Sequence, residues 1–162
     1  MFIGEYHHTI DEKGRIIIPS KFREELGYSF VITRGLENCL FVYSNTSWEK
    51  ICNKLNSLPF TKKDARVFNR FFMSGATSVE LDKQGRANIS APLIDYAKLI
   101  EDCVVTGTGD RLEIWSQEAW DEFFNSNKVF YNYRLIWFQL ISSWFNFCFR
   151  RNFFHHFSIY MI

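Results

Sequence analysis

The sequence lacks the features that mark most enzymes, metal-binding proteins and secreted proteins. Its 4 cysteines form no Cys-x-x-Cys pair and follow no regular spacing, which favours reduced, mostly buried thiols over a disulfide framework or a zinc site. It contains no Gly-x-Ser-x-Gly, His-Glu-x-x-His or other catalytic motif. The first residues lack the basic start and long apolar stretch of a signal peptide. We therefore expect a cytoplasmic protein that is not an enzyme, takes no small-molecule substrate, and needs no cofactor or metal.

An excess of charge of either sign is also missing. The chain has 19 basic and 18 acidic residues, and its formal net charge is +1. All 18 acidic residues precede residue 126, whereas residues 126–162 hold four of the basic ones: Lys128, Arg134, Arg150 and Arg151. Residues 1–125 are therefore slightly acidic, and their bulk charge does not attract nucleic acid. A DNA-binding function would have to come from local geometry.

Two patterns that suggest ligand binding have simpler interpretations. His7 and His8 are neighbours in a predicted strand, where successive side chains point to opposite faces, so they do not readily share one metal ion. We interpret them, and the pair at residues 155–156, as surface or partly packed histidines. Residues 106–110 resemble part of a phosphate-binding loop but lack the Gly-Lys-Ser/Thr that should follow, so we predict a hairpin turn there.

An internal repeat organises the chain. The run Asp11-Glu12-Lys13-Gly14-Arg15 recurs 71 positions later as Asp82-Lys83-Gln84-Gly85-Arg86. Further on, Leu40–Ser44 aligns with Leu112–Ser116, and Trp48 aligns with Trp120, both at a distance of 72 positions. Two copies are too few for a solenoid, so we expect two halves that pack on each other around a pseudo-twofold axis.

Each half predicts the same order of short strands and short helices. In the first half we expect strands at 4–10, 16–18, 30–33 and 40–43, a short helix at 21–26 opened by Pro19 and Ser20, and a second helix capped by Ser47. In the second half we expect strands at 75–81 and 86–89, a helix at 93–98, a hairpin from 103 to 115 and a helix from Gln117. A helix at 62–73, with Phe68, Phe71 and Phe72 facing inward, joins the halves. This pattern predicts an α+β, barrel-like domain.

The repeated Asp-x-x-Gly-Arg turn is the candidate functional motif. Gly14 and Gly85 permit a positive φ in the turn, and Asp11 and Asp82 can accept backbone N–H bonds that hold the loop. Two interpretations of the arginines stay open. Each could contact guanine in the DNA major groove or clamp a phosphate, or each could simply pair with its aspartate to fix the turn.

The run Asp11-Glu12-Lys13-Gly14-Arg15-Ile16-Ile17-Ile18-Pro19, followed by Lys21-Phe22-Arg23, resembles the first signature of the MraZ family. Leu81-Asp82-Lys83-Gln84-Gly85-Arg86, followed by Asp95-Tyr96-Ala97, resembles the second, and the likeness covers roughly residues 1–124. It implies two AbrB-like, swapped-hairpin halves in one chain. It also implies a ring-shaped homo-oligomer that binds tandem repeats in double-stranded promoter DNA of the division and cell-wall gene cluster, usually as a repressor on the nucleoid.

On this resemblance, the loop residues acquire roles. Arg15 and Arg86 would be the principal DNA contacts, Lys13 and Lys83 would assist at phosphates, and Lys21 and Arg23 would be weaker candidates. Within residues 11–25 four acidic residues cancel four basic ones, so one subunit should bind DNA weakly. A ring that presents many identical loops would gain affinity through multivalency.

The second repeat departs from the family pattern. Where the first has Ile16-Ile17-Ile18-Pro19, the second has Ala87-Asn88-Ile89-Ser90, and Asn88 interrupts the apolar run. We therefore expect a looser second strand pair, and a less secure transfer of the DNA-binding role to Arg86 than to Arg15.

The predicted organisation is a first half at residues 1–60, a connecting helix at 61–74, a second half at 75–125 and an atypical tail at 126–162. The tail holds 13 aromatic residues and no acidic residue, unlike the charged helical extension that the family normally carries here. Three interpretations stay open: a segment in a membrane interface, a packed oligomer contact, or out-of-frame translation, which we prefer. The alternative to a DNA-binding function is an AbrB-like antitoxin or protein-interaction module.

Overall fold

The structure is a computed structural model, and it describes residues 1–127. Residues 1–121 form one compact unit. Of the second unit, which starts at residue 122, the described part is the end of helix α5 and Asn127. The predictions made for the tail fall on residues 128–162 and lie outside the described residues.

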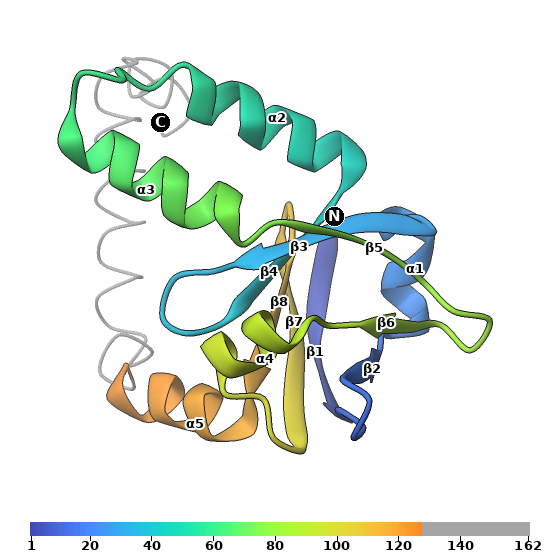
Figure 1. The fold of residues 1–162 in the computed structure, drawn as a ribbon. Coiled ribbons are helices and arrows are strands. Elements are labelled where there is room, and N and C mark those ends of the chain that lie inside the picture. Colours follow the sequence, from blue (N-terminus) through green and yellow to red (C-terminus); the bar gives the residue numbers. More distant parts are fainter. Residues whose placement is uncertain (128–162) are drawn as a thin grey trace, which may run out of the picture. The chain divides into compact units, whose positions relative to one another are not determined.

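The two halves contain the same elements in the same order (Figure 1). The first half holds β1 (Phe2–Thr9), β2 (Arg15–Ile17), α1 (Ser20–Leu26), β3 (Ser29–Arg34), β4 (Leu40–Ser44) and α2 (Asn45–Asn56). Helix α3 (Lys63–Ser74) follows. The second half holds β5 (Thr77–Glu80), β6 (Arg86–Asn88), α4 (Ala91–Ala97), β7 (Asp102–Gly109), β8 (Leu112–Ser116) and α5 (Gln117–Ser126).

The strands of the two halves exchange partners. A six-stranded antiparallel sheet has the order β1-β7-β8-β4-β3-β5, and a two-stranded sheet pairs β2 with β6. The first strand of each half therefore pairs with the third strand of the other half, as β1 with β7 and β5 with β3. The order is unchanged when the halves are interchanged, which is the pseudo-twofold symmetry expected from the repeat. The predicted α+β fold with duplicated, swapped halves is confirmed.

One hydrophobic core serves both halves. Alternate residues of the strands point into it because side chains alternate across a strand. Its members come from all eight strands and from α1 and α4, and the fully buried ones include Ile16, Ile18, Phe22, Phe30, Ala87, Leu93 and Ile114. A separate cluster forms where α2 and α3 lie against the β3–β4 hairpin, around Tyr43, Leu55 and Phe72. Burial of the core in one piece means that neither half has a complete core of its own.

Three local predictions are wrong in detail. Ser47 is not the cap of α2, because the helix begins at Asn45 and the Ser44 hydroxyl accepts the Ser47 N–H at 3.3 Å. Helix α1 begins at Ser20 and not at Lys21, and Pro19 is its N-cap residue. Of the α3 phenylalanines, Phe72 is 4% exposed, but Phe68 is 38% exposed and lies at the edge of an apolar cavity.

Within residues 1–127, no helix combines the length and the apolar character that crossing a membrane requires. The same residues contain no group of three or more His, Cys, Asp or Glu side chains placed to hold a metal ion.

Candidate nucleic-acid interface

The β2–β6 ribbon brings the two Asp-x-x-Gly-Arg motifs together. Arg15 lies opposite Asn88, Ile16 opposite Ala87, and Ile17 opposite Arg86. Residues that lie directly opposite each other share a face, and so do residues two apart in one strand. The inward face therefore carries Ile16 and Ala87, both fully buried, and the outward face carries Arg15, Ile17, Arg86 and Asn88.

The two loops that precede these arginines have matching hydrogen bonds. In the first loop, Oδ1 of Asp11 accepts the backbone N–H groups of Lys13 and Arg15, both at 3.0 Å. Its Oδ2 accepts Nε of Arg15 at 2.7 Å and pairs with Nη2 at 2.5 Å. One carboxylate thus closes the turn and fixes the direction of the arginine.

The second loop repeats this arrangement closely. Oδ1 of Asp82 accepts the backbone N–H groups of Gln84 at 2.8 Å and Arg86 at 3.0 Å. Its Oδ2 contacts both Nε and Nη2 of Arg86 at 2.7 Å. The loosening expected from Asn88 is wrong, because Asn88 occupies the outward position of Ile17 and leaves the buried positions to Ala87 and Ile89.

The ion pairs are reflected in the acidity of the carboxyl groups. The hydrogen bond from the Arg15 side chain, assisted by backbone N–H groups, lowers the pKa of Asp11 to about 2. The backbone N–H of Arg86, and then its side chain, lower the pKa of Asp82. The pKa of Arg15 is raised by its bond to Asp11 and, to a smaller degree, by the charge of Asp82 in the other loop. Both carboxyl groups are therefore ionised at neutral pH.

The aspartates leave part of each guanidinium available. The contacts use Nε and Nη2, and Nη1 of Arg15 and of Arg86 bonds to no residue in the described part of the chain. The Nη1–Nη2 edge is therefore free to donate two parallel hydrogen bonds, while the opposite edge is held by the carboxylate. The Asp–Arg pairing, which the sequence left as one of two interpretations, is present in both loops. A DNA contact by the same arginines stays a prediction.

Each loop is also packed against the short helix of the other half. A Cβ on Gly85 would lie 2.2 Å from Cζ of Arg23, and a Cβ on Gly14 would lie 2.8 Å from Cδ1 of Ile94. Both glycines have positive φ, 72° at Gly14 and 76° at Gly85. Arg23 and Ile94 are 71 positions apart and so are equivalent in the repeat. They perform the same packing task with different chemistry.

Arg23 has a structural explanation that the sequence did not suggest. Its Nε donates to the carbonyl of Ile18 at 2.7 Å, and its guanidinium lies directly against Gly85. It therefore positions the Asp82 loop rather than extending from the outward face of the ribbon. The sequence signal for this role was the equivalence of Arg23 with Ile94, which marks the position as a packing position.

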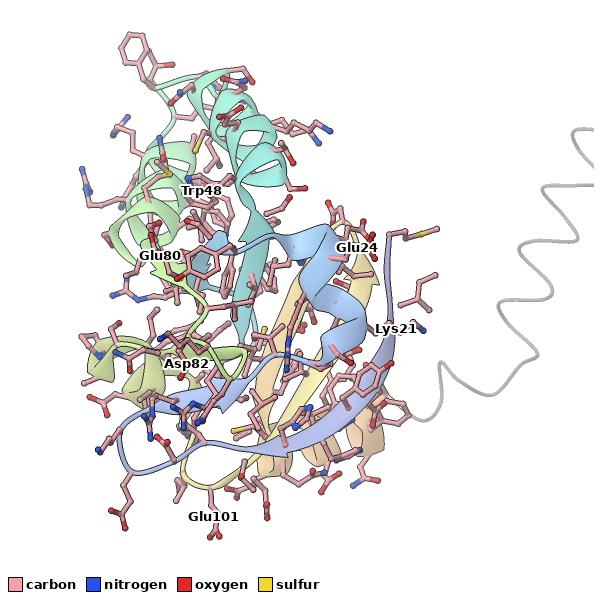
Figure 2. The ribbon with its side chains drawn as sticks, turned by 90° about the vertical axis from the view of Figure 1, so that its right-hand side faces the viewer. Lys21, Glu24, Trp48, Glu80, Asp82 and Glu101 are labelled. Carbon is pink, nitrogen blue, oxygen red and sulfur yellow. The ribbon has the colours of Figure 1, made fainter. Side chains whose placement is uncertain are left out.

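The lysines differ in their placement. Lys13 and Lys83 are exposed in the two loops. They are not equivalent, because Lys13 aligns with Gln84, whereas Lys83 aligns with Glu12. Lys21 lies on α1 and, in Figure 2, points away from the side on which Asp82 lies. The structure thus groups Lys13 and Lys83 with the arginines and separates Lys21 from them.

Comparison with known proteins also finds two equivalent halves in the chain. The family model described as "MraZ protein, putative antitoxin-like" matches residues 1–71 and again residues 72–130. The transcriptional regulator MraZ of Moorella thermoacetica is 59% identical over 123 residues, which cover 76% of this chain and 86% of that protein. The transcriptional regulator MraZ of a Thermoanaerobacter species is 57% identical over 129 residues, which cover 80% and 90%. With two matched halves and relatives of this similarity, the chain belongs to the MraZ family.

Proposed function

We propose that this protein is a sequence-specific DNA-binding transcriptional regulator that acts without catalysis. The observation that carries the proposal is the β2–β6 ribbon, whose outward face presents Arg15 and Arg86, each held by an aspartate. The names of the two relatives, both transcriptional regulators, support the same function.

The antiparallel pairing and the paired arginines of the ribbon suit base reading. A two-stranded antiparallel ribbon fits the major groove, and a guanidinium that donates two parallel hydrogen bonds matches O6 and N7 of guanine. An arginine held in advance loses less side-chain entropy on binding than a free one. Lys13 and Lys83 beside the ribbon would then contact phosphates, which adds affinity without sequence preference.

Affinity at the single-ribbon level should be low, because each arginine is paired with a carboxylate that a phosphate backbone repels. We therefore propose that the protein acts as a homo-oligomeric ring on tandem promoter repeats, where several ribbons bind together. The target would be the division and cell-wall gene cluster, the effect repression, and the location the cytoplasm, on the nucleoid.

The test is binding of the full chain to its own upstream promoter region, compared with a random duplex of equal length, over a series of salt concentrations. We expect specific, salt-sensitive binding that Arg15→Ala and Arg86→Ala each weaken by 10-fold or more, roughly the worth of one bidentate arginine–guanine contact. Arg70→Ala removes the same charge from an exposed position on α3 and is the matched control.

A folded oligomer that does not prefer the promoter over random DNA would refute the proposal. So would an equal loss of binding in the Arg15, Arg86 and Arg70 variants, since that would reduce the effect to bulk charge. Sedimentation of the same samples would test the ring separately.

A protein-interaction module is the second candidate. The family description contains the word antitoxin, and the structure has an apolar cavity of about 320 Å³ between α2, α3 and the β3–β4 hairpin. Leu58, Phe60 and Val67 are exposed in or near the same pair of helices. A folded protein that does not prefer the promoter over random DNA would favour a protein-interaction function over DNA binding.

A further inference from the structure

The outward face of the ribbon is symmetric in its backbone but not in its side chains. The pseudo-twofold relation makes Arg15 equivalent to Arg86, and Ile17 equivalent to Asn88. One end of the ribbon therefore carries Arg15 with Asn88 opposite, and the other carries Arg86 with Ile17 opposite. The ribbon has two chemically different ends.

Neither Ile17 nor Asn88 is needed by the fold at its position. Ile17 is 42% exposed, although its neighbours Ile16 and Ile18 are fully buried. Asn88 is exposed as well, and its side chain forms no hydrogen bond with any residue from 1 to 127. An unpaired amide and an uncovered aliphatic group lie beside two arginines on the same small surface.

These two side chains have opposite preferences for bases. An asparagine amide can donate to N7 of adenine and accept from its N6, whereas an aliphatic group gains most from the methyl group of thymine. We propose that Asn88 and Ile17 are specificity-determining residues, and that they give the ribbon a direction on DNA. The Arg15–Asn88 end reads a guanine beside an adenine, and the Arg86–Ile17 end reads a guanine beside a thymine.

This inference rests on the proposed function, since it requires the ribbon to enter the major groove. It predicts a DNA element that a ribbon with two identical ends would not select. A twofold ribbon with identical ends would select a palindromic element, whereas this ribbon selects an element that differs when read from the other side. The charges of the loops support the same polarity, because the first loop carries Lys13 next to the acidic Glu12 in the sequence, while the second carries Lys83 and the neutral Gln84.

The experiment is selection from a pool of random duplexes by the full chain, followed by sequencing. The variants are the exchange Ile17→Asn with Asn88→Ile, the single changes, and the conservative Asn88→Gln, which keeps an amide able to read adenine. For the native chain we expect a non-palindromic element. The exchanged chain is the native ribbon turned about the pseudo-twofold axis, so we expect it to select the same duplex element. Each single change makes the two ends alike, so we expect a palindromic element with adenine at both ends for Ile17→Asn and with thymine at both ends for Asn88→Ile. Each preference should change by roughly 5-fold to 100-fold.

The outcomes separate the inference from the function on which it rests. If both single variants select the same non-palindromic element as the native chain, while Arg15→Ala abolishes selection, the inference is wrong and the proposed function stands. If the native chain selects nothing, both fail. Asn88→Gln should retain the adenine preference that Asn88→Ile loses, and an equal loss in both variants would count against base readout. Circular dichroism verifies that each variant is folded, as expected for exposed positions.

Discussion

Replacing Gly85 by alanine tests whether Arg23 holds the Asp82 loop in place. A Cβ at this position would lie 2.2 Å from Cζ and 2.6 Å from Nε of Arg23. Because that Nε donates to the carbonyl of Ile18, the guanidinium cannot move aside without losing its hydrogen bond. Gly109 provides a matched control, since it also has a positive φ, 93°, but no atom within 4 Å of its added Cβ.

The magnitude follows from two separate costs. A residue with a Cβ in the left-handed region costs about 1–2 kcal/mol, and this cost applies to both glycines. Displacing a hydrogen bond made by a charged donor costs about 1–2 kcal/mol more at a half-buried site, and this applies to Gly85 alone. We expect Gly85→Ala to lower the free energy of unfolding by about 2–4 kcal/mol and Gly109→Ala by about 1–2 kcal/mol.

A double-mutant cycle isolates the contact. In an Arg23→Ala background the guanidinium that would clash with the new Cβ is gone. Gly85→Ala should then lower the free energy of unfolding only as much as Gly109→Ala does. The assay is urea unfolding of the full chain at a fixed protein concentration, because the proposed oligomerisation would make apparent stability depend on concentration. Equal costs for the two glycines in the native background would refute the reasoning, and so would a Gly85→Ala cost that Arg23→Ala leaves unchanged.

Three further predictions use the same unfolding assay. Ser44→Ala and Ser116→Ala should each destabilise by about 1 kcal/mol, because each hydroxyl accepts a first-turn N–H of the following helix at 3.3 Å; unequal losses would contradict the equivalence of the halves. Thr33→Val should cost about 1–3 kcal/mol, since it removes a buried 2.6 Å hydrogen bond to the Phe72 carbonyl, whereas no loss would mean that the carbonyl finds another donor. The lowered pKa of Asp11 means that its contribution is complete above about pH 4 and is lost as the pH falls towards 2, so Asp11→Asn should flatten the pH dependence of stability in that window; a curve parallel to that of the native chain would count against the ion pair.

The sequence predicted best where a structure depends on neighbouring residues. The Asp-x-x-Gly-Arg turns form as expected because a carboxylate reaches the N–H groups two and four positions ahead, and glycine permits the positive φ. The sequence was a poorer guide where two nearby residues could serve the same structural role. Ser44 and Ser47 are both suitable caps for α2, and the choice depends on where β4 ends, which its pairing with β3 and β8 decides.

Asn88 shows why a rule about composition can mislead. The sequence suggested that a polar residue in an apolar run would loosen the strand pair, but burial in a ribbon alternates, and Asn88 has an outward position. The same alternation leaves Ile17 exposed in the first repeat, although nothing in the run Ile16-Ile17-Ile18 distinguishes it from its neighbours.

The sequence by itself determined the duplication, which is visible as a repeat. It also determined the order of the short elements and the two aspartate-held turns, because these depend on contacts within a few positions of the chain. Only the tertiary structure decided that β2 pairs with β6, that Arg23 lies on Gly85, and that Arg15 and Arg86 share one outward face. These contacts join residues some sixty to seventy positions apart, and no local pattern encodes them. They form because neither half can bury its apolar residues alone, and the exchange of strands completes one core for both.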